Sequence, residues 1–241
     1  MIPKKIHYCW FGKKPLPKEV LKYMESWRKY LPDCEIKEWN EENFDVNQFK
    51  YTKEAYFAKK YAFVSDVARL QALVSEGGLY LDTDILILKP LDPYLWSTNA
   101  FIGFEHDTFI GTGVIASKAD HPLFKDFLSS YKSKSFFKGL NYNEETNVSQ
   151  ITDFFSKKGL IRNNTKQIIE DVVVYPQNYF CNKNWYTGQY YNDKQSYTIH
   201  DYQSSWCERS SNLLHRIKRK IKKILTISTF FFENLFSSKN L

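Results

Sequence analysis

The sequence GGLYLDTDILIL spans residues 77–88 and places two acidic residues between two short apolar runs. Residues 52–76, just before it, contain no proline or glycine and carry apolar side chains over several turns, which predicts a helix with a break near Tyr61. Gly77 and Gly78 end this helix as a C-terminal cap, and a strand follows. Asp82 and Asp84 lie beside that strand, where charge is costly unless something binds it.

The segments around this stretch alternate between strand and helix patterns. Residues 5–11 alternate and are aromatic, residues 18–30 carry apolar side chains at helical spacing, and residues 35–39 form a second strand pattern. This order is typical of an α/β sheet domain. Further along, the patterns predict strands at 100–105, 112–117 and 171–175, helices at 121–132 and 146–158, and a long ordered loop region over a site at 176–206.

Composition limits the classes of protein that the chain can belong to. Of its 241 residues 43% are hydrophobic and 25% charged, which fits one globular domain and excludes disordered, collagen-like and disulfide-scaffold classes. The net charge is +7, and residues 207–241 carry most of it, with eight basic and two acidic residues. Because a nucleic-acid-binding domain spreads basic residues over its folded body, we expect no nucleic acid partner.

The basic C-terminal segment has the pattern of an amphipathic helix. Basic residues alternate with the apolar Leu214, Ile217, Ile221, Ile224 and Leu225. The apolar run 224–232 is too short for a membrane span, which needs about 20 residues. We therefore divide the chain into a folded domain, residues 1–206, and a tail, residues 207–241, that lies on an anionic membrane surface. The alternative is a helix packed on the domain or on a second subunit.

The cysteines and the N-terminus indicate the cellular compartment. Cys9, Cys34, Cys181 and Cys207 have no spacing typical of a zinc site or redox motif, so we expect free thiols. The first residues run into a strand pattern without the apolar stretch of a signal peptide. We expect a cytoplasmic protein, peripheral on the inner face of the cell membrane.

The pair Asp82 and Asp84 is the sharpest local feature. In an extended chain, residues i and i+2 point the same way, so both carboxylates can face one hard cation and the phosphate oxygens that it binds. A calcium-binding EF-hand loop is excluded because Leu86 and Ile87 occupy its fifth and sixth positions. A solvated strand end is the alternative interpretation.

Other candidate residues lie on either side of this pair. Asp66 and Arg69 share one helix face, either to hold sugar or ribose hydroxyls or as a surface ion pair. Trp10 offers a flat ring to a nucleobase or packs in the core, and His200 is a metal ligand or a structural histidine. No phosphate-binding GxxxxGK[ST] loop is present, so a metal must hold the phosphates of any nucleotide.

Taken together, these pieces resemble glycosyltransferase family 32, a DXD sugar-transferase group with many capsular and surface polysaccharide enzymes. The layout is also similar to the catalytic domain of the large glucosylating toxins. The matching motifs, in order, are IPKKIHYCWFG at 2–12, AFVSDVAR at 62–69, GGLYLDTD at 77–84, Ile199-His200 and Ser205-Trp206.

This resemblance implies a role for each matching residue. Trp10 stacks on uracil, Asp66 and Arg69 hold the donor sugar, Asp82 contacts ribose and sugar or reaches the metal through water, and Asp84 binds manganese directly.

The remaining matches add to the donor site. Tyr8 is counted with the donor-binding residues and Tyr80 supports the ribose. His200 is the second protein ligand to the metal, although the toxins carry no histidine there, and Ser205 and Trp206 touch the diphosphate.

The resemblance also implies a GT-A fold, that is, a Rossmann-like mixed sheet flanked by helices, and retention at the anomeric carbon. We expect a transferase dependent on Mn²⁺ or Mg²⁺ that moves a sugar from a nucleotide-sugar donor, a UDP-sugar or for mannose a GDP-sugar, to a lipid-linked surface glycan. Front-face, substrate-assisted transfer is our hypothesis for the mechanism. The alternatives are a hydrolase of glycans or nucleotide sugars and a non-catalytic module that binds membrane or nucleic acid; the oligomeric state stays open.

Overall fold

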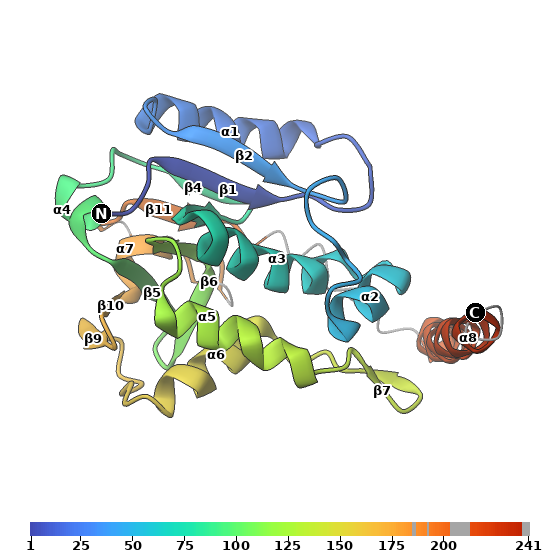
Figure 1. Ribbon diagram of the computed structural model, residues 1–241. Coiled ribbons are helices and arrows are strands. Elements are labelled where there is room, and N and C mark those ends of the chain that lie inside the picture. The colour runs from blue at the N-terminus through green and yellow to red at the C-terminus, as the bar shows by residue number, and fades with distance from the viewer. Residues whose placement is uncertain (185–186, 192, 203–212, 238–241) are drawn as a thin grey trace.

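A mixed sheet of seven strands forms the centre of the computed structural model, which describes residues 1–184, 187–191, 193–202 and 213–237 (Figure 1). The parallel strands β2, β1 and β3 form one half, β6 runs antiparallel to β3 and β5, and β10 lies parallel to β5 with β9 at the edge. In sheet order the strands are β2 (Glu35–Trp39), β1 (Lys5–Cys9), β3 (Gly78–Leu81), β6 (Phe109–Ser117), β5 (Ala100–His106), β10 (Val172–Tyr175) and β9 (Gln167–Ile169).

Helices cover both faces of this sheet. On one face α1 (Lys18–Tyr30) packs Val20, Met24 and Trp27 into the core that contains Ile6 and Leu81. The opposite face is covered by α2 (Lys50–Phe57), α3 (Tyr61–Glu76), α5 (Pro122–Ser129), the 3₁₀ turn η1 (Ser130–Ser133) and α6 (Asn147–Ser156). Figure 1 shows the two layers on either side of the strands. The α/β, mixed-sheet architecture expected from the sequence is confirmed.

The predicted helix at 52–76 is two helices. Helix α2 ends at Phe57, Lys59 takes a left-handed backbone conformation, and α3 begins at Tyr61, where the break was expected. At the other end the Gly77 N–H caps the Leu73 carbonyl, and the chain turns directly into β3. This turn places Asp66 and Arg69 of α3 near the end of β3, which Asp82 follows directly.

The sequence patterns missed several short elements. The stretch expected to be a loop at 176–206 contains α7 (Gln177–Phe180) and β11 (Thr198–His200), and β11 pairs antiparallel with β4 (Ile85–Ile87). These elements have four and three residues, too few to show a periodicity. The other elements not predicted are α4 (Pro93–Ser97), β9 and the hairpin of β7 (Phe137–Lys138) and β8 (Asn141–Tyr142).

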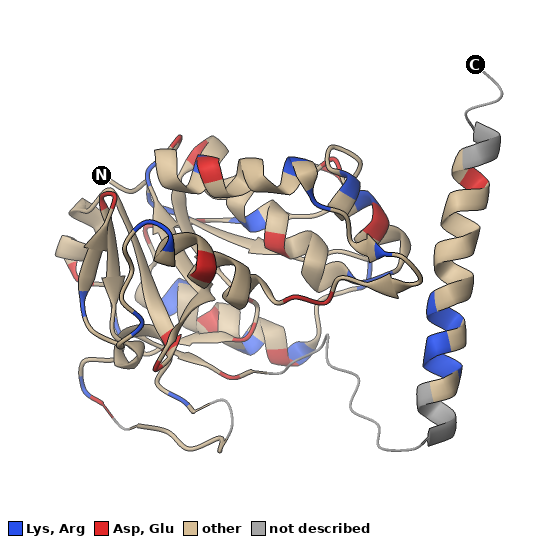
Figure 2. Cartoon of the chain, turned by 90° about the horizontal axis from the view of Figure 1, so that it is seen from below, with Lys and Arg blue, Asp and Glu red and all other residues tan. Residues whose placement is uncertain are grey.

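The basic tail forms α8 (Leu213–Ser237), as predicted. Ile227 and Phe230 are buried, and the Phe230 ring lies 5.1 Å from the rings of both Phe57 and Phe137. The side of α8 that carries Ile227 and Phe230 therefore packs on the domain, which was the alternative to lying on a membrane. On other sides Ile217, Ile221, Leu225, Phe231 and Phe232 are exposed, and the basic residues gather in the N-terminal half, as Figure 2 shows. Among the described residues, no helix combines the length and apolarity needed to cross a membrane.

We predict that Gly77→Ala lowers the free energy of unfolding by about 3 to 5 kcal/mol. Gly77 has φ +64°, and a Cβ there would lie 2.5 Å from the Ala119 nitrogen and 2.9 Å from the Ser117 oxygen. Backbone strain costs about 1–3 kcal/mol and a clash in a packed region about as much again. Urea unfolding measures the change.

The matched control is Gly159→Ala. Gly159 also has a positive φ, +101°, but nothing lies within 4 Å of the position that a methyl group would take there. This variant should lose only the strain contribution, about 1–3 kcal/mol. Equal losses in the two variants would show that the contact with residues 117–119 does not constrain the turn.

Candidate functional site

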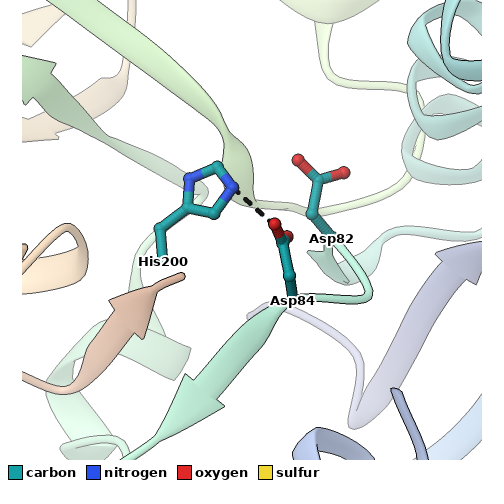
Figure 3. A group of neighbouring side chains, drawn as sticks. All are labelled: Asp82, Asp84 and His200. Carbon is teal, nitrogen blue, oxygen red and sulfur yellow. Dashed lines mark ion pairs between the residues drawn. The ribbon is translucent and has the colours of Figure 1, made fainter. Parts of the chain in front are cut away.

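Two carboxylates and an imidazole meet at the carboxyl end of β3. The ligand atoms of Asp82, Asp84 and His200 all lie within 4.8 Å of one another. His200 Nε2 is 3.2 Å from Asp84 Oδ1, and Figure 3 shows Asp82 beside this pair. All three side chains are largely buried. Carboxylate oxygens with one neutral imidazole suit manganese and magnesium, and the group fits such an ion.

Backbone pairing brings these three residues together. The Asp82 N–H donates to the Gly113 carbonyl of β6, and the Ile85 N–H closes a turn onto the Asp82 carbonyl. Strand β11 then pairs with β4 so that His200 lies opposite Ile85. A Cβ on Gly113 would lie 3.1 Å from both Asp82 Oδ2 and His200 Cε1, so a larger residue here would press on both side chains.

Arg69 connects this group to α3 and β6. Its Nη2 lies 3.0 Å from Asp66 Oδ1 and 3.4 Å from Asp82 Oδ1, and its Nη1 donates to the Thr112 carbonyl. The guanidinium also lies over the Tyr80 ring at 4.8 Å, and the Tyr80 hydroxyl donates to Asp82 Oδ1. The Arg69 side chain is only 6% exposed, so these partners replace its water.

Burial and charge shift the pKa values in this site. Burial raises the pKa of Asp66 to about 6, because the stabilisation by Arg69 only partly offsets it. Burial alone would lower the pKa of His200, but the Asp84 carboxylate outweighs it and holds that pKa well above the ordinary value. A cation at this site must displace the His200 proton, so its binding strengthens as the pH rises.

A cavity of about 600 Å³ opens at the carboxyl ends of β1 and β2, the strands next to β3. Trp10 lines it together with Glu38 and Asn40, and the indole Nε1 donates to the Lys14 carbonyl. Tyr8 lies behind this wall: its buried ring contacts Trp27 and its hydroxyl donates to Glu38 Oε2. The cavity is wide enough for a flat ring beside Trp10.

The chain resembles known proteins over most of its length. Residues 17–101 match the family described as "Glycosyltransferase sugar-binding region containing DXD motif". An uncharacterized glycosyltransferase of Acanthamoeba polyphaga mimivirus is 30% identical over 86% of this chain and 84% of its own length. The chain belongs to the DXD-motif glycosyltransferases. The initiation-specific alpha-1,6-mannosyltransferase of Candida albicans is 22% identical over 77% of this chain and 58% of its own length.

Among solved structures, the PaToxG glycosyltransferase is similar to this DXD-motif glycosyltransferase with 20% identity and a TM-score of 0.46. The similarity covers 66% of this chain and 69% of that one. The resemblance to family 32 noted from the sequence is confirmed by the family match and the mimivirus relative. The mixed sheet flanked by helices that this resemblance implied is present.

The structure brings most of the predicted site residues of this glycosyltransferase together. Asp82, Asp84 and His200 form one group, and Asp66, Arg69 and Tyr80 adjoin it. Trp10 lines the neighbouring cavity and Tyr8 supports its wall. Ser205 and Trp206, predicted at the diphosphate, lie outside the described residues.

The sequence analysis did not identify the residues of β6 and β5 that border the site. Gly113 and Thr112 of β6 contact the predicted residues, and Glu105 of β5 is a further carboxylate whose pKa burial raises. Glu105 comes at the end of an apolar strand, as Asp82 does, and this pattern could have identified it as a site residue. Its proximity to Asp82 depends on the pairing of β5 with β6, which one sequence does not reveal.

We predict that Asp66→Asn changes the pH dependence of stability. The pKa of Asp66 rises from 3.8 to about 6 on folding, so its contribution is complete below about pH 4 and is lost as the pH rises through about 6. As the pH rises from about 4 to 7, the free energy of unfolding of D66N should therefore increase relative to that of wild type. D66N should also lose transferase activity. Denaturant unfolding across this range, without metal or nucleotide, measures it.

The control is Asp126→Asn, because the Asp126 side chain is 61% exposed and lies outside the site. D126N should keep its transferase activity and gives the baseline for the loss of an exposed carboxylate. A difference between D66N and wild type that does not change with pH would contradict the raised pKa of Asp66.

Proposed function

We propose that the chain is a metal-dependent, retaining glycosyltransferase that moves a sugar from a UDP-sugar to a lipid-linked surface glycan. The group of Asp82, Asp84 and His200 carries this proposal, since it offers two carboxylates and one imidazole within 4.8 Å at the end of a central strand. Family membership supports the transfer of a sugar over the hydrolytic and non-catalytic alternatives.

The donor lies across the carboxyl ends of the strands, where ligands bind in open α/β sheets. The nucleobase stacks on Trp10 in the cavity at β1 and β2, and the diphosphate reaches the end of β3. Asp84 and His200, with Asp82 directly or through water, would hold a divalent cation, which would supply positive charge to a leaving diphosphate. Arg69 adds a buried positive charge beside it.

The protein side chains orient the transferred sugar. Asp66 accepts hydrogen bonds from sugar hydroxyls, while its ion pair with Arg69 fixes the carboxylate at the α3 end of the site. The acceptor hydroxyl approaches the same face that the diphosphate leaves, and the departing phosphate oxygen takes its proton. This front-face route retains the anomeric configuration without a covalent sugar–protein adduct.

We propose further that α8 holds the domain beside a lipid-linked acceptor. Ile217, Ile221 and Leu225 are 47%, 53% and 61% exposed, and Lys218 and Lys222 lie next to them on the helix. An apolar face between lysines matches the chemistry of an anionic lipid surface. The cytoplasmic face of the cell membrane carries such lipids, and we propose that the protein is peripheral there.

We predict that manganese and one nucleotide class raise the melting temperature of the protein together. UDP, GDP and a panel of their sugars are compared with and without Mn²⁺, because a ligand that binds the native state stabilises it increasingly as its concentration rises above its Kd. Asp84→Asn and His200→Ala should each lose the manganese-dependent shift, because each removes a ligand atom. Each substitution should lower the affinity for Mn²⁺ by at least about tenfold.

Asp126→Asn is the matched control and should keep the whole shift. A shift that does not need manganese would contradict metal dependence, and no shift with any nucleotide would contradict the donor class. Transfer to an acceptor glycan, against release of free sugar, separates the transferase from a hydrolase. An adduct of sugar and protein trapped by mass spectrometry would overturn the front-face route.

We predict that the wild-type chain sediments with vesicles containing phosphatidylglycerol and stays in solution with pure phosphatidylcholine vesicles. The variant Lys218→Glu/Lys222→Glu should weaken binding to the anionic vesicles by about tenfold or more, since each basic residue near the surface contributes about 1 kcal/mol. The variant Ile221→Ser/Leu225→Ser should weaken it by removing apolar contact.

The matched control is Lys18→Glu/Lys22→Glu, the same double change at exposed positions of α1, which lies on the other face of the sheet from the elements that α8 contacts. If all of these variants bind as wild type does, the tail does not bind the lipid. Equal binding of the wild type to neutral and anionic vesicles would contradict the role of charge.

A further inference from the structure

Glu105 is a carboxylate of the site that the roles above do not use. It lies near the end of β5 and is partly exposed, and the charges that act on it most are His200, Asp82 and Asp84. It does not belong to the group of possible metal ligands. Within the described part of the chain, its carboxyl has no hydrogen bond or ion pair, so its hydrogen-bonding capacity is open to a ligand.

Residues 111–113 of β6 lie between Glu105 and the metal group. Strand β6 departs from regular pairing with β5 here, since Ile110 pairs with Phe104 but Ile115 pairs with Ile102. A Cβ on Gly111 would lie 2.8 Å from Glu105 Cβ and 2.9 Å from its Oε2, and a Cβ on Gly113 would meet Asp82 and His200. These side chains thus cover the two glycines, and residues 111–113 form a floor beneath them.

The order of the strands in the sheet indicates which part of the donor lies near residues 111–113 of β6. From β1 and β2 the sheet continues through β3 and β6 to β5. Strands lie about 4.8 Å apart, so Glu105 is about 10 Å across the sheet from the β3 end. A donor with its base at Trp10 and its diphosphate at Asp82 and Asp84 reaches β6 and β5 with its sugar.

We propose that the transferred sugar lies between Glu105 and the metal group and that Glu105 accepts hydrogen bonds from its hydroxyls. This inference rests on the proposed function and extends it by naming a specificity-determining residue. A carboxylate accepts from two neighbouring hydroxyls at once and so selects their configuration. With Asp66 on the α3 side and Glu105 on the β5 side, carboxylates hold the sugar from two directions.

The test compares UDP with UDP-sugars in Glu105→Gln. Calorimetry with Mn²⁺ measures the affinities of UDP, UDP-glucose, UDP-galactose and UDP-N-acetylglucosamine, and UDP release without acceptor measures hydrolysis. For the sugar that the wild type prefers, E105Q should bind the UDP-sugar about tenfold more weakly, the loss expected for one hydrogen bond to a charged group. Affinity for UDP should stay within about twofold of wild type.

Gly111→Ala is a second variant, because its methyl group displaces Glu105 without removing the charge. It should show the same selective loss for UDP-sugars. Glu35→Gln is the control: its side chain is 61% exposed at the opposite ends of the strands, and its affinities should equal those of wild type. Melting temperatures show that each variant is folded.

Two results would overturn the proposal. An equal loss of UDP and UDP-sugar affinity in E105Q would mean that Glu105 acts through the metal group. Unchanged donor binding and hydrolysis with slower transfer would place Glu105 at the acceptor. Failure of the proposed function would be seen separately, as a wild-type protein that binds neither UDP nor any UDP-sugar.

Discussion

The buried guanidinium of Arg69 is the interaction on which the rest of the site depends. It joins Asp66 of α3, Asp82 after β3 and the Thr112 carbonyl of β6, and it lies over the ring of Tyr80. A buried cation is tolerated only when its partners replace its water. Because each partner comes from a different element, the helix and the two strands are fixed relative to one another at this point.

The mixed sheet explains why so many polar groups converge here. Strands β1, β3 and β5 run in the same direction and end at the same edge, while β6 runs between β3 and β5 in the opposite sense. That antiparallel strand contributes Thr112 and two glycines between Asp82 and Glu105, where its pairing with β5 is irregular. The β4–β11 pair then brings His200 from near the end of the domain against residues that follow β3.

The sequence predicted those elements and site residues whose pattern lies within one short stretch of the chain. Helix 18–30 and strand 35–39 have the predicted bounds, because the helix carries apolar residues at helical spacing and Pro32 separates it from the strand. Asp82 and Asp84 were identified because charge beside an apolar strand needs a partner. Glu105 carries the same signal, yet its place opposite Gly111 depends on strand register. The role of His200 came from a motif alone, since β11 has only three residues and pairs with a distant strand.

The protonation of His200 bears on how the site is kept ready for a cation. With its pKa raised by Asp84, the imidazolium pairs with that carboxylate at 3.2 Å and holds it in the position of a ligand. A divalent cation that bound here would take the place of this proton as the positive partner of Asp84. Because β3, β4 and β11 already hold the three side chains close together, little free energy would be needed to order them.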